Sequence, residues 1–159
     1  MARPPLIILV IALVVCLVSI FAAFILAPSS ACRDFNAGII TYDNKQQLSV
    51  ALARTTDEHQ QGLSGCSSVP PGHGMYFIFP VKTDISFWMK GMKIPIDIVW
   101  LSDNKVIGIT ADVPPPTSPQ AVLPLYPAPA PVDAVLEIGA GEAQKLKIHQ
   151  GSIFAIEHE

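Results

Sequence analysis

The chain has 159 residues and carries 10 Lys and Arg against 13 Asp and Glu, which gives a formal net charge of −3. Half of the residues are apolar and only 14% are charged. This composition excludes a disordered acidic chain, and it excludes a nucleic-acid binder built on a basic surface. The apolar excess is concentrated in the first 27 residues, and the remainder has the composition of an ordinary small globular domain.

The N-terminal segment, residues 1–27, is predicted to be a membrane anchor. The stretch that begins at Leu6 and ends at Ala27 has no charged residue. As a helix it would span about 33 Å, enough for a hydrocarbon core of about 30 Å. It is also longer than the apolar region of a typical cleaved signal peptide. Two alternatives stay open, namely cleavage after Ala31 and lipidation of Cys32.

The short N-terminus indicates the side of the membrane on which the rest of the chain lies. Lys and Arg are nearly balanced on the two sides of the apolar segment, so the positive-inside rule decides little. Only five residues precede the segment, as in a signal anchor whose N-terminus stays in the cytoplasm. We therefore expect a single-pass protein of the cell membrane with its C-terminal domain on the extracytoplasmic side.

Two of the three cysteines are candidates for a disulfide. Cys16 falls within the apolar segment, where a packing role is expected. Cys32 and Cys66 are the other two, and in an oxidising compartment they could pair and close a loop that stabilises the fold by about 3–4 kcal/mol. Two unpaired thiols are the alternative, because spacing alone does not establish the geometry that a disulfide needs.

The chain after the anchor is predicted to be a linker, residues 28–37, followed by a β domain, residues 38–159. Apolar runs between turn residues predict strands at 38–42, 48–53, 75–79, 84–90, 96–101, 106–110, 132–138 and 153–157. Thr55 and Glu58 have the spacing of a capping box, which predicts a short helix that ends near Gly62 or Gly65. Residues 141–146 predict one or two helical turns.

A proline-rich segment interrupts the strands. Residues 113–131 hold 8 of the 15 prolines, and proline cannot donate a hydrogen bond to a sheet, so a long extended loop is predicted. The elements together indicate a mainly β fold class, a small antiparallel sandwich or jelly-roll-like barrel with two short helices, preceded by one transmembrane helix.

Several blocks of the sequence resemble one family. They are Gln61-Gly62-Leu63, GMYFIFP at 74–80, SFWMK at 86–90, IPIDIVWL at 94–101, LYPAPAP at 125–131 and VLEIGAGEAQKLKIHQGS at 135–152. In order and spacing, over about residues 46 to 157, the chain resembles the bacterial and archaeal family called domain of unknown function 192 (DUF192). The resemblance implies a compact, mainly β sandwich of jelly-roll type, often with an N-terminal signal or anchor, and it implies no activity.

The chain departs from the family pattern in two places. Gly91 and Met92 follow the Trp-Met-Lys motif, where the family usually has Asn-Thr. Ser64 and Cys66 follow the Gly-Leu pair, where the family usually has Met and a basic residue. A shared role for these positions is therefore not implied.

The predicted strand 84–90 holds the main candidate binding residues. Side chains of a strand alternate between its faces, so Ser86, Trp88 and Lys90 would share one face. A Trp between a hydroxyl and an amine is suited to stacking on a sugar or a cation. Alternatively, Trp88 packs under the proline-rich loop. Asp97 is expected on the neighbouring strand, where a structural ion pair with Lys90 is favoured, and Tyr126 of the proline-rich loop could form one wall of a pocket.

No motif for nucleophilic catalysis, zinc hydrolysis or phosphate binding occurs, so we predict no catalytic residue, no metal and no cofactor. A hydrolase remains an alternative, with Asp84 and Asp97 as paired carboxylates or with Cys66 and His73 as nucleophile and base. A soft-metal protein that holds copper through methionine and histidine is a further alternative.

The preferred function is a non-catalytic binding or interaction module of the cell envelope, held in the membrane by residues 6–27. Its expected partner is an envelope ligand or protein, not a nucleic acid. A purely structural envelope component is the third possibility.

Overall fold

The computed structural model describes residues 33–35, 37–43, 45–118 and 121–157. The predicted anchor, residues 1–27, and Cys32 lie outside these ranges. Within the part of the chain that the structure describes, no helix is both long and apolar enough to span a bilayer. The end of the predicted linker packs on the domain, because Phe35 is only 3% exposed and belongs to the hydrophobic core.

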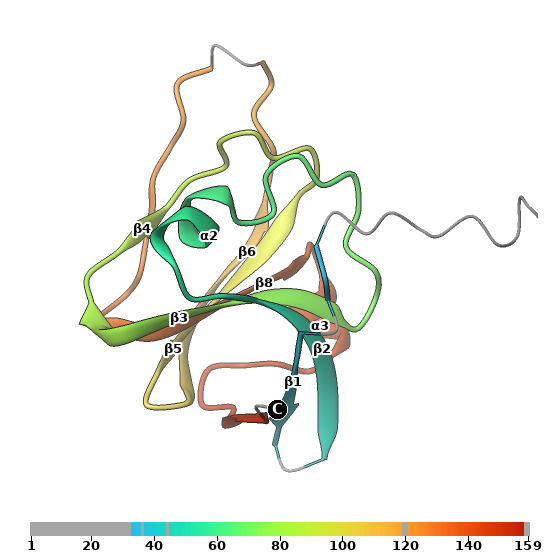
Figure 1. Cartoon of the computed structure of the whole chain (residues 1–159), viewed down its shortest axis with the longest axis vertical. Coiled ribbons are helices and arrows are strands. Elements are labelled where there is room, and N and C mark those ends of the chain that lie inside the picture. Colours follow the sequence, from blue (N-terminus) through green and yellow to red (C-terminus); the bar gives the residue numbers. More distant parts are fainter. Residues whose placement is uncertain (1–32, 36, 44, 119–120, 158–159) are drawn as a thin grey trace, which may run out of the picture. The chain divides into compact units, whose positions relative to one another are not determined.

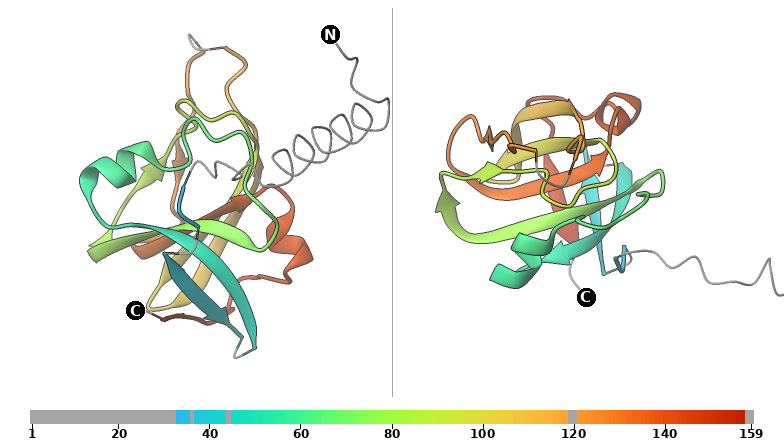
Figure 2. Two further views of the ribbon diagram at one scale, coloured as in Figure 1. Left: turned by 45° about the vertical axis from the view of Figure 1, so that its right-hand side comes forward. Right: turned by 90° about the horizontal axis from the view of Figure 1, so that it is seen from above.

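The domain is mainly β and is built on one curled seven-stranded sheet (Figures 1 and 2). The sheet order is β6-β5-β8-β3-β2-β1-β9, and β4 and β7 form a separate two-stranded ribbon. The elements are β1 (Gly38–Tyr42), β2 (Gln46–Ala53), α2 (Thr56–Gln61), β3 (His73–Thr83), β4 (Ser86–Phe87), β5 (Ile96–Ser102), β6 (Lys105–Val113), β7 (Tyr126–Pro127), β8 (Val132–Gly139), α3 (Glu142–Lys145) and β9 (Phe154–Glu157).

The mainly β class and the two short helices are confirmed, but the sheet is not wholly antiparallel. β2 and β3 pair in parallel, whereas the other strand pairs are antiparallel. A parallel pair needs a long crossover, and here α2 and the loop after it supply one. The sequence pattern predicts strands and their ends, and it does not tell in which direction neighbouring strands run.

The two edges of the sheet meet near the C-terminus, which gives it the form of a half-barrel. The Val106 N–H donates to the Ser152 carbonyl at 2.9 Å, and the Gly151 N–H donates to the Val106 carbonyl at 2.8 Å. The segment before β9 is thereby bonded to the start of β6, while β9 itself pairs with β1. This contact covers an edge that would otherwise expose unpaired backbone groups.

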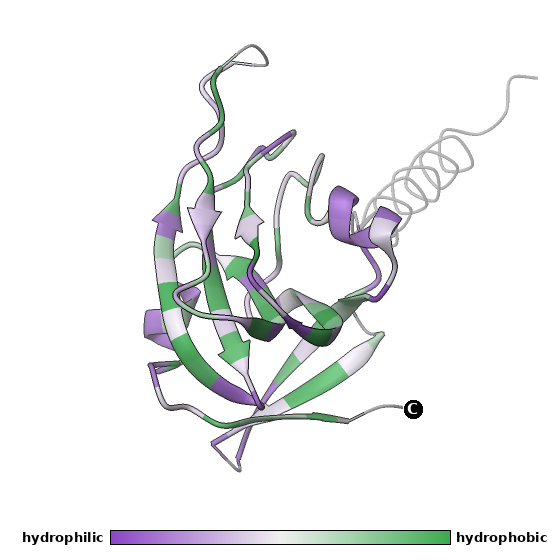
Figure 3. Cartoon of the chain, turned by 90° about the vertical axis from the view of Figure 1, so that its left-hand side faces the viewer, coloured by the Kyte–Doolittle hydropathy of each residue, from purple (hydrophilic) through white to green (hydrophobic). Residues whose placement is uncertain are grey.

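Each face of the sheet carries its own hydrophobic core, and the hydrophobic residues lie on the strands while the two helices are largely hydrophilic (Figure 3). One core gathers around Tyr42, Phe154 and Leu136. The other gathers around Phe77, Trp100 and Leu63. The crossover that contains α2 lies on the second face, since Leu63, two residues after α2 ends, is fully buried there.

The strands predicted at 96–101 and 106–110 are confirmed, and they pair as the hairpin β5–β6. Its two-residue turn, Asp103 and Asn104, has both residues at positive φ, as a tight hairpin turn between twisted strands requires. The predicted strand 84–90 is wrong in length, because β4 ends at Phe87. The proline-rich segment is not wholly a loop, because Tyr126 and Pro127 form β7 and pair with β4.

The capping box at the start of α2 generates the first prediction. The Glu58 N–H donates to the Thr55 hydroxyl at 3.3 Å, and the Thr55 N–H donates to the Glu58 carboxylate at 2.8 Å. Thr55→Ala removes one of these bonds and should lower the free energy of unfolding by about 1 kcal/mol, measured by urea denaturation. The exposed neighbour Thr56→Ala is the matched control. Equal losses in the two variants would contradict the role of the cap.

Candidate functional site

A small cavity lies between the inner strand β8 and the crossover after α2. Its volume is about 20 Å³, which is room for one water-sized group. We call it the Glu137 slot, and it is lined by His59, Gln60, Gln61, Gly62, Leu63, Phe77, Phe87, Trp88, Lys90, Met92 and Glu137.

Glu137 is a charged residue type within β8, a strand that is buried over most of its length. Glu137 is 5% exposed, and in the sheet register it lies between Met75 of β3 and Ile98 of β5. The backbone N–H of Leu63 donates a hydrogen bond to its carboxyl group. The other carboxyl oxygen, Oε2, is buried and has no hydrogen-bond partner within the described part of the chain. Buried polar atoms without a partner are rare and costly, which singles this atom out.

Burial sets the protonation of this group. Loss of solvation raises the pKa of Glu137 from its ordinary 4.5 to about 8, although the Leu63 hydrogen bond and the positive charge of Arg33 both act to lower the pKa. At neutral pH the carboxyl group is therefore mainly protonated. In that state one oxygen accepts from the Leu63 N–H, and the other becomes a hydrogen-bond donor in the slot.

The crossover places the Leu63 N–H over Glu137. α2 ends with the Gly62 N–H bonded to the Glu58 carbonyl at 2.9 Å, and Gly62 then turns the chain at φ 46°. A Cβ atom at Gly62 would lie 3.4 Å from the Phe77 ring and 3.6 Å from Glu137 Oε2. The glycine therefore serves two purposes, a positive φ and the open space beside the unpartnered oxygen.

Arg33 ties the chain that precedes β1 to the same turn. Its Nε donates to the Gly62 carbonyl at 2.7 Å, and its Nη2 donates to the Ser64 carbonyl at 3.3 Å. These carbonyls belong to the residues on either side of Leu63. The guanidinium therefore fixes the turn whose Leu63 N–H binds Glu137.

Trp88 and Lys90 stand at the exposed side of the slot. The Trp88 residue is 46% exposed, and the Lys90 Nζ lies 5.2 Å from the centre of the Trp88 ring, a cation–π contact. Lys90 is held in a turn in which the Met92 N–H donates to the Met89 carbonyl at 3.1 Å, with Gly91 at φ 70°. Met89 and Met92 are buried below this turn.

Aromatic side chains form the floor of the region. Phe87 packs edge-on against Phe77 at 5.0 Å and against Trp100 at 5.5 Å between ring centres. His59 lies 4.7 Å from Phe79 between ring centres, and its Nε2–H donates a hydrogen bond to the Ala53 carbonyl at 3.1 Å. The carboxyl group of Glu137 is thus a polar group among apolar and aromatic side chains.

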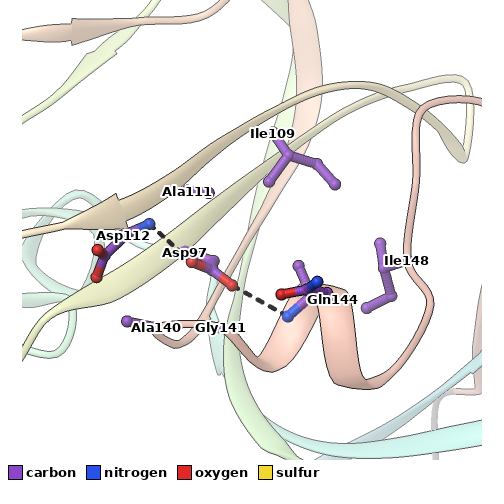
Figure 4. Close-up of a pocket in the computed structure, with 9 residues that line it drawn as sticks. Asp97, Ile109, Ala111, Asp112, Ala140, Gly141, Gln144 and Ile148 are labelled. Carbon is purple, nitrogen blue, oxygen red and sulfur yellow. Dashed lines mark hydrogen bonds between the residues drawn. The ribbon is translucent and has the colours of Figure 1, made fainter.

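Asp97 belongs to a different and larger cavity, of about 630 Å³, between β6 and α3 (Figure 4). Asp97 is 1% exposed, and its two oxygens accept hydrogen bonds from the Asp112 N–H at 2.9 Å and the Ala143 N–H at 3.0 Å. The predicted ion pair with Lys90 is wrong, because Lys90 lies over Trp88 instead. Asp97 joins a bulge of β6 to the start of α3, and with both oxygens bonded it is a structural tie.

The remaining predicted residues lie apart from the slot. Ser86 is exposed and pairs with Pro127 across the β4–β7 ribbon, so it does not share a strand face with Trp88 and Lys90. Tyr126 is half-buried and lines a separate cavity of about 160 Å³ under the proline-rich loop, with Met89. Of the five predicted binding residues, the structure brings Trp88 and Lys90 together with Glu137.

The cysteine and metal alternatives meet specific obstacles. Cys66 is buried and disulfide-bonded, so it is not a free nucleophile, and its predicted partner Cys32 lies outside the described residues. Met75 and Met89 are 3% and 2% exposed and fill the core. No three side chains of His, Cys, Asp or Glu gather as metal ligands in the ranges that the structure covers.

Comparison with known proteins decides the family. The model of the DUF192 family, described as an uncharacterized ACR, matches residues 39–156. The chain belongs to the DUF192 family. No curated protein matches the chain.

Two solved structures are similar to this DUF192 chain. A protein of unknown function from Novosphingobium aromaticivorans has 30% identity and a TM-score of 0.67, over 74% of this chain and 83% of that one. A Sinorhizobium meliloti protein, described as a proposed transcription regulator, has 26% identity and a TM-score of 0.66, over 74% of this chain and 92% of that one.

The sequence analysis of this DUF192 chain missed Glu137, although a signal was present. Glu137 interrupts the otherwise apolar run 134–138 of β8. A carboxyl group at such a position has to be paired, neutral or functional. Its neighbours Gly62 and Leu63 are more than 70 residues away in sequence, so only the fold shows which turn covers it.

The pKa of Glu137 in the DUF192 domain predicts a pH dependence of stability. Because the folded-state pKa is above the unfolded one, its contribution to stability is present in full below about pH 4.5 and is lost as pH rises through about 8. The free energy of unfolding should fall over this range with a slope of up to about 1.4 kcal/mol per pH unit. Glu137→Gln should flatten the slope in urea denaturation. An unchanged slope in the variant would contradict an acid of raised pKa at this position.

The role of Asp97 in the DUF192 domain generates a third prediction. Asp97→Ala leaves two backbone N–H groups without acceptors and should lower the free energy of unfolding by about 2–4 kcal/mol. Asp112→Asn is the control, because it changes an exposed carboxylate in the same cavity and should cost less than about 0.5 kcal/mol. Thermal unfolding measures both. A folded Asp97→Ala variant as stable as the control would contradict the structural role.

Proposed function

We propose that this DUF192 protein is a non-catalytic binding module of the cell envelope and that its ligand engages the Glu137 slot. The observation that carries the proposal is the unpartnered, buried Oε2 of Glu137 beside an exposed Trp88 and Lys90. A ligand atom in the slot would supply the missing hydrogen-bond partner. The rest of the ligand would lie against the Trp88 ring.

Membrane anchoring forms part of the same proposal. The uncharged stretch between Leu6 and Ala27 supports a single-pass anchor, and the disulfide at Cys66 supports an oxidising, extracytoplasmic location for the domain. Such a protein would present its slot to envelope ligands while it stays tethered to the bilayer.

Binding is favoured over hydrolysis by the state of the acidic groups. Asp97 is saturated by backbone N–H groups, and Glu137 lies in a cavity too small for a substrate and an attacking water together. Catalysis by paired carboxylates needs two such groups about 5–10 Å apart around the substrate. Among the residues lining the slot, Glu137 is the only carboxylic acid.

A nucleic-acid ligand is not favoured, despite the description of the Sinorhizobium protein. The described helices α2 and α3 have six and four residues, too short to serve as a recognition helix in a major groove. The chain also carries a net negative charge.

Indole N–H resonances offer a local test of the binding proposal. The chain has two Trp residues, and the Trp100 Nε1 is bonded to the Thr110 hydroxyl at 2.9 Å in the core, whereas Trp88 is exposed. We expect at least one of benzoate, benzamide, benzyl alcohol, benzylamine and glucose to shift the Trp88 signal of the full chain in detergent and to leave the Trp100 signal in place.

Two glycine variants locate the effect. Gly62→Ala places a methyl group beside Glu137 Oε2 and should weaken the Trp88 response at least tenfold. Gly65→Ala is the matched control, since Gly65 also has a positive φ but no atom lies within 4 Å of a Cβ there. Binding that persists in Gly62→Ala, or a full probe set that leaves Trp88 unshifted, would contradict the proposal.

A further inference from the structure

We propose that the group received by the Glu137 slot is a carboxylate, presented by a ligand whose flat or apolar body lies against Trp88. This inference rests on the proposed function and names the class of ligand.

The unpartnered oxygen of Glu137, Oε2, needs a hydrogen-bond acceptor when the carboxyl group is protonated. The Leu63 N–H already donates to one oxygen of the carboxyl group, so the proton of the neutral acid belongs on Oε2, which borders the cavity. A neutral carboxylic acid that meets a carboxylate forms an O–H···O⁻ hydrogen bond, which is short and charge-assisted. An ammonium group has no acceptor to offer this proton.

The charges around the slot favour an anion. The titratable and charged groups that face Glu137 are Arg33 from the segment before β1, His59 from α2 and Lys90 from the turn after β4. On the strands β3 and β5 its register partners are Met75 and Ile98, which carry no charge. An entering carboxylate would meet two permanent positive charges, whereas a cation would be repelled by both.

A cation would also have to displace the proton of Glu137. With a pKa of about 8, deprotonation at pH 7 costs a cationic ligand about tenfold in affinity. A carboxylate carries no such cost at pH 7. It meets the cost only above about pH 8, where Glu137 becomes negative.

The size of the slot limits what enters. A volume of about 20 Å³ accommodates one oxygen-sized group, so only the tip of a planar carboxylate can enter. A tetrahedral phosphate is larger and carries a second negative charge. The body of the ligand remains outside, where the exposed Trp88 ring and the Lys90 ammonium lie together.

Matched probes test the class of ligand by isothermal titration calorimetry of the full chain in a non-ionic detergent. Benzoate and N-acetylphenylalanine present a carboxylate as a small acid and as a peptide-like terminus. Benzamide and N-acetylphenylalaninamide are their uncharged counterparts, and benzylamine and phenyl phosphate are the cation and the larger anion. We expect a carboxylate probe to bind at least tenfold more tightly than its amide, and the tighter of the two acids tells a small-acid site from a site for a chain terminus.

Proton linkage identifies the group that responds. Carboxylate binding should weaken by about tenfold per pH unit above pH 8 and should take up a proton at pH 9, seen as a dependence of the heat on the buffer. Glu137→Gln keeps a donor toward the slot and should bind without this pH dependence. Glu137→Leu has no donor and should lose at least tenfold in affinity, with near-native circular dichroism as the control for folding.

Three results would overturn the inference. Tighter binding of benzylamine, with release of a proton at pH 7, would assign a cationic ligand, and tighter binding of phenyl phosphate would assign a phosphate. In both cases a loss of binding in Gly62→Ala would leave the proposed function intact. If all six probes fail to bind, the carboxylate class is wrong, and the Trp88 signal in the wider probe set then decides whether the binding module fails with it.

Discussion

The hydrogen bond from the Leu63 N–H to Glu137 joins β8, an inner strand of the sheet, to the crossover that makes β2 and β3 parallel. The two residues that it joins are neighbours in space but lie far apart in the sequence. α2, with its capping box, sets where the crossover turns, and Gly62 supplies the positive φ that directs the Leu63 N–H at the sheet. Arg33 then binds the two carbonyls on either side. Several unrelated segments therefore depend on one buried carboxyl group.

An apolar residue would satisfy the packing at this position without any cost of desolvation. The chain instead keeps a carboxyl group there, leaves one of its oxygens without a partner and leaves space beside that oxygen. Asp97 shows the contrasting arrangement one strand away, where a carboxylate of similar burial has both oxygens bonded and serves as a tie. The cavity beside Asp97 is larger, but its buried carboxylate already has hydrogen-bond partners on both oxygens. It therefore gives less indication of a ligand than the Glu137 slot does.

The sequence predicted what depends on local pattern. The capping box at Thr55, the turn at Asp103 and Asn104 and most strands follow from periodicity and turn chemistry, and the structure bears them out. It did not predict the parallel pair or the end of β4 at Phe87, because strand direction and pairing partners are set by tertiary contacts. Only part of the candidate site was predicted from the sequence. Trp88 and Lys90 were predicted from a short motif, whereas Glu137 was missed because it lies inside an apolar run and its partner Leu63 is distant in the chain.

Direct titration of the Glu137 carboxyl carbon by NMR, in protein labelled with ¹³C at glutamate side chains, tests the central claim most directly. The account predicts one resonance that titrates near pH 8 and is absent from the spectrum of Glu137→Gln, while the pKa values of Glu58 and Glu142 lie below their ordinary value because each carboxylate accepts hydrogen bonds. If every glutamate carboxyl carbon titrates below about pH 5.5, Glu137 is ionised at neutral pH, and both the donor in the slot and the ligand class built on it are wrong.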